Sequence, residues 1–251
     1  VGNAAYEHKE HVAKNRTIAA TTSKDGAVVA DCRICGETFK TVKTIAKIKA
    51  VSLSSSSYTY DGSAKKPGVT VTDANGAKIA SSNYSVAYSN NVKKGTATVT
   101  VTFKGNYSGT VKKTFKINPA KVSNVKLSST SYTYNGKTKT PSVTVKDSKG
   151  RKLKNGTDYT VKYSAGRKNV GRYAVKVTFK GNYTGSKTVY YYIVPKSTSI
   201  SKVSALKKGF KLSWKKQKTQ TTGYQIQYST SSKFKKAKTV NVSKNKTTSK
   251  S

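Results

Sequence analysis

The sequence predicts an all-β protein made of tandem small β-sandwiches, and three observations support this fold class. Thr, Ser, Val and Tyr are abundant while Met is absent, a composition that suits half-buried, pleated strands better than packed helices. Apolar and polar residues alternate over short segments bounded by Gly, Asn and Asp. The chain also repeats itself at an offset of 74 to 76 residues. Its 251 residues leave room for two or three small domains.

The repeat consists of four segments that match between two copies. The segment S-S-S-S-Y-T-Y-D-G begins at Ser54, and S-S-T-S-Y-T-Y-N-G begins at Ser128. The other matched pairs are 67–73 with 141–147, 84–88 with 159–163, and 101–109 with 177–185. The second copy has single-residue insertions at Asn155-Gly156 and near Gly166-Arg167, which are turn-like sequences where loop length changes most easily.

Within each copy the alternation predicts about six or seven short strands, the number of a small two-sheet sandwich. The run from Tyr190 to Tyr192 must place at least one ring outward, because neighbouring side chains of a strand point to opposite faces. Pro119 and Pro195 close the two copies at matching places. We therefore place one domain at 48–120 (repeat 1) and a second at 121–196 (repeat 2). The side chains expected to face the two cores are Val69, Val71, Tyr84, Val86, Tyr88, Val99, Val101 and Phe103, then Val143, Val145, Tyr159, Val161, Tyr163, Val175, Val177 and Phe179.

The motifs S-Y-T-Y-[DN]-G, P-x-V-T-V-x-D and F-K-G-N-Y-[ST]-G occur in both copies. With these motifs the repeats resemble the immunoglobulin-like repeats of large cell-surface and secreted proteins of Gram-positive, gut-type anaerobic bacteria. The resemblance covers about 49–195. It implies immunoglobulin-like sandwiches with a spacer or adhesion role, and it names no ligand.

From about Thr198 the pattern changes, which sets a third module at 197–251. Val203, Leu206, Phe210, Leu212 and Trp214 alternate as a pair of strands, and residues 223–229 alternate as another. This segment resembles the first half of a fibronectin type III domain, in which a Trp packs beneath a Tyr-rich strand. We expect an incomplete sandwich, completed either by chain beyond Ser251 or by strands of another subunit.

Residues 1–47 form an N-terminal module with the features of a metal site. His8 and His11 have the spacing H-x-x-H, and Cys32 and Cys35 lie in C-x-x-C-G, the sequence of a zinc knuckle. A hairpin over 17–31 around Asp25-Gly26 would bring the two pairs together as a Cys2His2 site for structural zinc. The segment resembles Cys-knuckle modules that precede such repeats, although those carry an additional upstream Cys. A local disulfide, and thiols left from a lost metal site, stay open as alternatives.

The charge is extreme, with 49 basic and 9 acidic residues and a net charge of +40. Such a chain attracts polyanions. Only five of the basic residues are Arg and 44 are Lys, whereas bidentate reading of bases and phosphates favours Arg. The sequence has neither a recognition-helix pattern nor an RNP-type aromatic motif. We therefore expect binding of anionic polymers and no specific nucleic-acid recognition.

No catalytic residues are predicted, and the chain is not expected to be an enzyme. The two His lie within residues 8–11, which leaves no distinguishable nucleophile with a base. The matched Asp73 and Asp147 lie at turns, where a carboxylate ordinarily accepts hydrogen bonds from backbone amides. No run of 18 apolar residues occurs, so no membrane-spanning segment is expected.

These observations predict an extracellular structural and adhesive protein of the cell surface or cell wall. It would be a cationic stalk that contacts anionic wall polymers or host glycans and proteins, with self-association as a further expectation. Two alternative functions stay open. One is a non-catalytic accessory region of a secreted cell-wall-active enzyme, and the other is a subunit of an extracellular filament.

Overall fold

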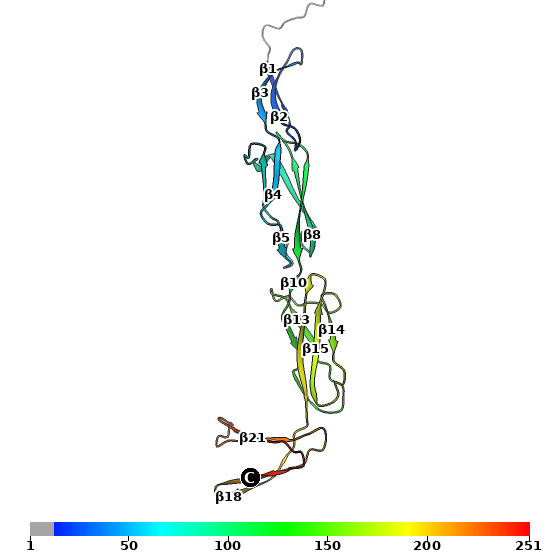
Figure 1. Ribbon diagram of the computed structural model, residues 1–251, viewed down its shortest axis with the longest axis vertical. Coiled ribbons are helices and arrows are strands. Elements are labelled where there is room, and N and C mark those ends of the chain that lie inside the picture. The colour runs from blue at the N-terminus through cyan, green and yellow to red at the C-terminus, as the bar shows by residue number, and fades with distance from the viewer. Residues whose placement is uncertain (1–12) are drawn as a thin grey trace, which may run out of the picture. The chain divides into compact units, whose positions relative to one another are not determined.

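The computed structural model describes residues 13–251 and confirms the all-β fold class (Figure 1). The regular secondary structure of the described chain consists of strands and one short 3-10 helix, and no helix within it is long and apolar enough to cross a membrane. The chain divides into two compact units, one ending at Ala120 and the other beginning at Lys121. The two-residue strand β10 (Ala120–Lys121) lies at this boundary.

The described part of the N-terminal module is an antiparallel sheet of three strands, β1 (Ala13–Ile18), β2 (Gly26–Cys32) and β3 (Thr38–Ile45), in the order β1-β2-β3. The hairpin predicted over 17–31 is present, since Ile18 pairs with Ala27. Its turn precedes Gly26, and β3 adds a third strand beyond the predicted hairpin. Gly26 has to be glycine because a Cβ there would lie 2.4 Å from both Ala20 N and Ile18 O.

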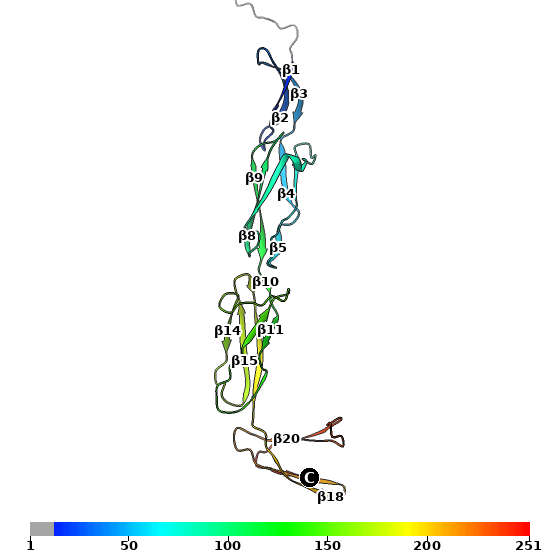
Figure 2. The same cartoon turned by 180° about the vertical axis from the view of Figure 1, so that it is seen from behind.

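Repeat 1 is a sandwich of a two-stranded and a four-stranded sheet (Figure 2). The small sheet pairs β4 (Ile48–Leu53) with β6 (Val69–Asp73). The larger sheet has the order β5-β9-β8-β7, made of β5 (Ser57–Thr59), β7 (Tyr84–Ser89), β8 (Gly95–Phe103) and β9 (Thr110–Asn118). The helix η1 (Ser81–Asn83) precedes β7. Strand β5 runs parallel to β9, whereas the other pairs are antiparallel.

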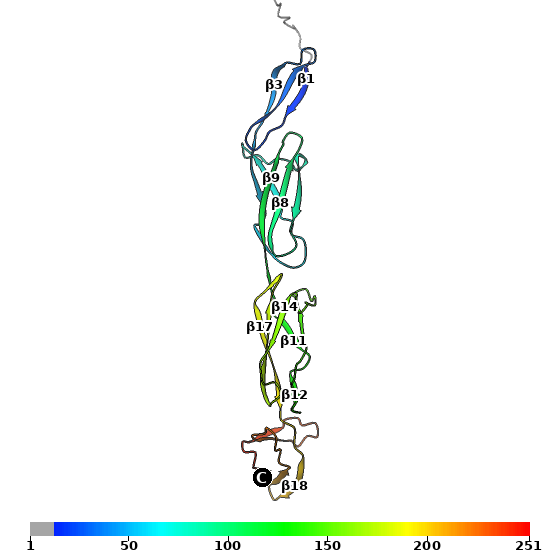
Figure 3. The same ribbon diagram turned by 90° about the vertical axis from the view of Figure 1, so that its right-hand side faces the viewer.

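Repeat 2 has the same topology (Figure 3). Its small sheet pairs β11 (Asn124–Leu127) with β13 (Val143–Lys146). Its larger sheet has the order β12-β17-β15-β14, made of β12 (Ser131–Thr133), β14 (Tyr159–Tyr163), β15 (Gly171–Phe179) and β17 (Ser186–Val194). The short strand β16 (Tyr183–Thr184) precedes β17. Strand β12 is again parallel to β17, so the internal repeat of the sequence is a repeat of structure.

The inward side chains of both sandwiches are those that the alternation predicted. Val99 and Val101 in repeat 1, and Val175 and Val177 in repeat 2, have no exposed surface. The predicted Tyr side chains of β7 pack against the core of repeat 1. One difference between the two cores lies in the last strand, where Tyr191 of repeat 2 stands in place of Phe115 of repeat 1. Both rings are buried and take an edge-on contact from a Tyr of the parallel strand, with centroids 5.6 Å apart for Tyr58–Phe115 and 5.8 Å apart for Tyr132–Tyr191.

The hydroxyl of Tyr191 donates to a loop carbonyl that a different side chain satisfies in repeat 1. Lys65 N donates to Asn91 O (2.7 Å), and Lys139 N donates to Arg167 O (2.9 Å), so the same loop contact is present in both repeats. In repeat 1 the carbonyl of Lys65 accepts from Asn91 Nδ2 at 2.8 Å, whereas in repeat 2 the carbonyl of Lys139 accepts from Tyr191 Oη at 2.8 Å. Each repeat therefore satisfies this carbonyl with a different side chain.

The C-terminal module has two small sheets. One has the order β18-β19-β22, made of β18 (Ile200–Leu206), β19 (Gly209–Trp214) and β22 (Ser249–Lys250). The other pairs β20 (Tyr224–Tyr228) with β21 (Lys238–Val242). The predicted strand pair is present, and Trp214 packs edge-on against Tyr224 with ring centroids 5.3 Å apart. The core is small, with Leu212, Trp214 and Val242 buried.

We expect Tyr191→Phe to destabilise repeat 2 by about 1 kcal/mol, because the Lys139 carbonyl loses its hydroxyl donor while the core keeps its ring. Asn91→Ala should destabilise repeat 1 by a similar amount for the same reason. Amide hydrogen exchange of β15 and β8 measures each repeat separately. Equal protection of β15 in wild type and Tyr191→Phe would show that the hydroxyl contributes nothing.

Candidate functional site

The turn between β2 and β3 contains both cysteines. Cys32 N donates to Glu37 O (2.8 Å) and Gly36 N donates to Cys32 O (2.9 Å), which closes the turn tightly. Gly36 has a φ of +76°, a conformation that favours glycine. The amide of Ile34 points at Cys32 Sγ, 3.4 Å away.

The turn offers two thiols of unequal access, since Cys32 is 2 % exposed and Cys35 lies on the surface. The neighbouring Asp31 accepts hydrogen bonds from Arg16 Nε and Thr38 Oγ1, each at 2.6 Å. Within residues 13–251 no group of three or more His, Cys, Asp or Glu side chains is placed to hold a metal. The proposed ligands His8 and His11 lie outside the described residues, so the Cys2His2 zinc site stays a prediction.

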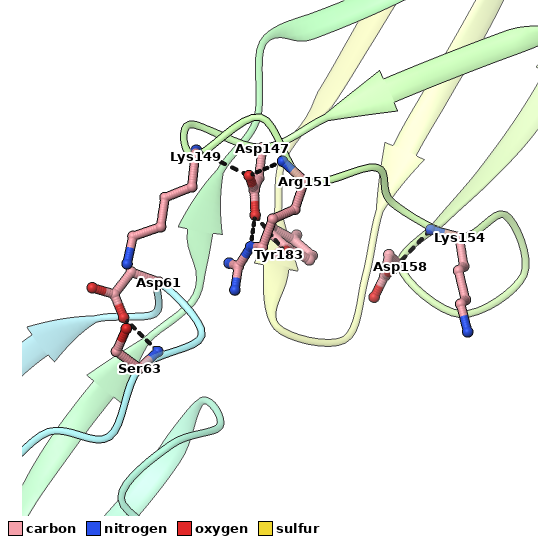
Figure 4. A network of polar contacts seen from close by, with 8 residues as sticks. All are labelled: Asp61, Ser63, Asp147, Lys149, Arg151, Lys154, Asp158 and Tyr183. Carbon is pink, nitrogen blue, oxygen red and sulfur yellow. Dashed lines mark hydrogen bonds and ion pairs between the residues drawn. The ribbon is translucent and has the colours of Figure 1, made fainter.

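The most elaborate polar cluster surrounds Asp147, which is buried (Figure 4). Its Oδ1 accepts from the backbone amides of Lys149 and Arg151, both at 2.9 Å. Its Oδ2 accepts from Arg151 Nε at 2.7 Å and from Tyr183 Oη at 3.2 Å. The predicted turn role of this carboxylate is confirmed.

The pKa of Asp147 reflects two opposing influences. Burial disfavours the charged carboxylate and would raise its pKa, but the hydrogen bonds and charge of Arg151, together with the amide of Lys149, outweigh burial and lower the pKa below its ordinary value of 3.8. In repeat 1 the matched Asp73 also accepts from backbone amides, those of Asn75 (3.0 Å) and Ala77 (2.9 Å). Ala77 stands where repeat 2 has Arg151, so the ion pair is a feature of repeat 2.

The other acidic residues of the two repeats have the same role. Residues 48–196 contain four acids, Asp61, Asp73, Asp147 and Asp158. Asp61 accepts from Ser63 N (2.8 Å), and Asp158 accepts from Lys154 N (2.9 Å), as Figure 4 also shows. All four carboxylates therefore hold turns. None is left on the strand faces to neutralise the lysines there.

Lysines of the two repeats accordingly occupy outward strand positions without facing acids. In repeat 1, Lys112 and Lys116 of β9 are exposed and lie opposite Thr100 and Thr96 of β8. In repeat 2, Lys162 of β14 lies directly opposite Lys176 of β15. The arrangement suits attraction of anionic polymers over an extended face.

The sequence predicted only part of the tyrosine run on β17. Tyr191 is buried, while Tyr190 and Tyr192 are 41 % and 47 % exposed on the opposite face. Arg172 lies over the ring of Tyr190, with its Cζ 3.6 Å from the centroid. Arg172 was not among the predicted site residues, because its place opposite Tyr192 depends on the register between β15 and β17.

We expect Asp147→Asn to destabilise repeat 2 by about 2 kcal/mol near neutral pH, because the amide keeps the turn but loses the ion pair with Arg151. The pKa of native Asp147 is lowered, so its stabilising charge is present above the ordinary pKa and is lost as the pH falls through the lowered value. The difference between variant and wild type should therefore narrow below pH 3.8.

Hydrogen exchange of β15 amides at several pH values measures this difference. Asp73→Asn is the matched control in repeat 1 and should cost less, about 1 kcal/mol, since Ala77 provides no ion pair. A penalty at Asp147 that is independent of pH would contradict the electrostatic explanation.

We expect iodoacetamide to alkylate Cys35 at least about tenfold faster than Cys32 when chelator is present, because burial hinders attack by the Cys32 thiol. Mass spectrometry of timed samples gives both rates. If both cysteines resist alkylation until chelator is added, they hold a metal. If they resist alkylation until a reductant is added, they form a disulfide.

Comparisons with known proteins place the repeats in a family. No curated protein matches the chain. Among solved structures, domains 4–9 of the surface layer protein SbsC align over 95 % of this chain and 44 % of that chain, with 15 % identity and a TM-score of 0.19. Domains 4 and 5 of the S-layer protein SbsC align over 71 % of this chain and 93 % of that chain, with 16 % identity and a TM-score of 0.20. The chain thus spans less than half of the first of these structures.

The family model described as the MBG domain matches residues 49–121 and 123–197, and the chain therefore belongs to the MBG domain family, of which it contains two tandem copies.

Proposed function

We propose that this chain is a structural, non-catalytic part of a bacterial cell-surface protein, in which tandem MBG domains act as cationic spacers held against anionic polymers of the cell wall. One observation carries this proposal. The four carboxylates of the two repeats all bind backbone amides of turns, which leaves the lysines of the strand faces to act on an external polyanion. The MBG family and its tandem arrangement support the surface role.

The charge excess makes the attraction long-ranged and tolerant of ligand geometry. The net charge of +40 is carried mostly by Lys, a hydrated point charge on a flexible stem that suits diffuse attraction more than fixed bidentate recognition. Such attraction retains a protein on a polyanion without a dedicated pocket. It also predicts a strong dependence on salt.

The strand pairing of each repeat suits a spacer under load. In repeat 1 the early strand β5 is parallel to the last strand β9, with Tyr58 opposite Ile117. In repeat 2 the early strand β12 is parallel to the last strand β17, with Tyr132 opposite Ile193. Tension along the chain pulls two such parallel strands in opposite directions, so it shears all their hydrogen bonds at once instead of opening them one after another. This geometry favours a mechanical role.

We expect the protein to be retained on immobilised anionic wall polymer at low salt and to elute steeply between about 0.1 M and 1 M salt, because the screening length falls from about 10 Å to about 3 Å. The variant Lys112→Glu/Lys116→Glu, which lowers the net charge from +40 to +36, should elute at lower salt. Lys112→Arg/Lys116→Arg keeps the charge and should elute with wild type. Retention that is insensitive to salt would contradict the electrostatic mechanism.

A further inference from the structure

We propose that the outer face of the four-stranded sheet of repeat 2 is a binding site for anionic polysaccharide. The site consists of Arg172, Tyr190 and Tyr192 together with Lys162 and Lys176, and is called here the aromatic–cationic surface. This inference rests on the proposed function, because it locates on one sheet face the contacts that would distinguish an acidic glycan from polyanions in general. Its evidence is the exposure of the rings, the placement of the cations and the contrast with repeat 1.

The two rings are held in place by the strand that carries them. Tyr191 is buried in the core, which forces Tyr190 and Tyr192 to the outer face, where 41 % and 47 % of each residue is exposed. Arg172 pairs across the strands with Tyr192 and stacks on Tyr190 at 3.6 Å. A guanidinium stacked on an aromatic face is oriented before any ligand arrives, so binding has less side-chain freedom to remove.

The cations of this face have no acidic neighbours in the sequence that surrounds them. From Tyr159 to Ser251 the chain has 22 Lys and Arg residues and no Asp or Glu. Lys162 and Lys176 lie directly opposite one another, an arrangement of like charges that is unfavourable by itself. An anion bound between the two ammonium groups would relieve that repulsion.

The aromatic side of the surface opens into a shallow groove. Tyr190, Tyr192 and Arg172 line it together with Lys126 and Thr130, and the groove has a volume of about 650 Å³. From Arg172 to Lys176 the surface extends about 13 Å along β15, at about 3.3 Å per residue. This length suits a chain of sugar units more than a single small ion.

Repeat 1 has the same sheet face without these side chains. The strand register matches Arg172, Tyr190 and Tyr192 to Thr96, Thr114 and Lys116, with Thr96 opposite Lys116 just as Arg172 is opposite Tyr192. Lys162 and Lys176 correspond to Ala87 and Thr100, which likewise lie directly opposite one another. The two faces share their topology and differ in their side chains, so the surface is a property of repeat 2 and not of the fold.

The chemistry of the surface favours an acidic polysaccharide over other polyanions. Exposed Tyr rings offer apolar faces to the C–H groups of a sugar ring and a hydroxyl to its polar edge. Arg172 offers paired N–H donors to a carboxylate, phosphate or sulfate group. Two rings and one stacked Arg are too few side chains for a stable protein–protein interface, which typically has about 20–30 residues on each side. An acidic peptide lacks sugar rings to stack, and single-stranded nucleic acid is the alternative that also stacks.

The test uses the full chain and a variant that gives repeat 2 the residues of repeat 1. The variant Arg172→Thr/Tyr190→Thr/Tyr192→Lys removes one positive charge and adds one, so the net charge stays at +40. The reciprocal variant Thr96→Arg/Thr114→Tyr/Lys116→Tyr places the surface on repeat 1, again without a change in net charge. Binding is measured by titration with polygalacturonate, poly-L-glutamate, polyuridylate and neutral dextran at fixed salt.

We expect the first variant to bind polygalacturonate about tenfold more weakly than wild type, and to bind poly-L-glutamate within about twofold of wild type. A tenfold loss corresponds to about 1.4 kcal/mol. The reciprocal variant should bind polygalacturonate more tightly than wild type and show additional sites. Circular dichroism and β15 hydrogen exchange establish that each variant is folded, and if the first variant fails to fold, Tyr190→Thr alone and the reciprocal variant provide the test.

Three results would overturn the inference. Unchanged polygalacturonate binding in both variants, with steep salt dependence retained, would leave dispersed charge as the whole mechanism. An equal loss for all three polyanions would show a surface that does not distinguish glycans, and a loss greatest for polyuridylate would assign it to nucleic acid. Absence of polyanion binding even by wild type at low salt would instead refute the proposed function, so the two failures are distinguishable.

Discussion

Hydrogen bonds between turn amides and four carboxylates are the interaction on which the surface of both repeats depends. Asp61, Asp73, Asp147 and Asp158 each accept from the backbone of their own turn, and residues 48–196 contain no other acid. Lysine cannot replace a turn carboxylate, since a carboxylate accepts hydrogen bonds from turn amides and an ammonium group only donates them. The few acids therefore lie at turns, and the strand faces are left cationic.

The alternation of strand side chains explains why the fold was predictable. Val99, Val101 and Phe103 all point into the core because every second side chain of a strand lies on the same face. Their matches in repeat 2 follow the same rule. The turn role of Asp147 was equally predictable, because its matched Asp73 shares the position. What the pattern could not supply was the pairing of β5 with β9 in parallel, since side-chain alternation is the same for parallel and antiparallel partners.

The less predictable features are those that depend on contacts between distant residues. Nothing in the sequence around Lys139 indicates that its carbonyl is satisfied by Tyr191, 52 residues away, when repeat 1 uses Asn91 for the same purpose. The stacking of Arg172 on Tyr190 likewise depends on the register between β15 and β17. The ligands predicted at His8 and His11 lie outside the described residues, so the structure describes only the turn with Cys32 and Cys35.

The two repeats together separate the demands of folding from those of binding. Several side chains that hold the sandwich together are present in both copies, as the buried valines and the matched turn residues Asp73 and Asp147 are. Tyr190, Tyr192 and Arg172 are not shared, since Thr114, Lys116 and Thr96 occupy the same ladder positions in repeat 1. Exposing two aromatic rings on a sheet face carries a risk of aggregation, and repeat 1 forms the same sheet without them. A difference that folding does not require, and that physical chemistry disfavours on a bare surface, is best explained by a molecule that covers it.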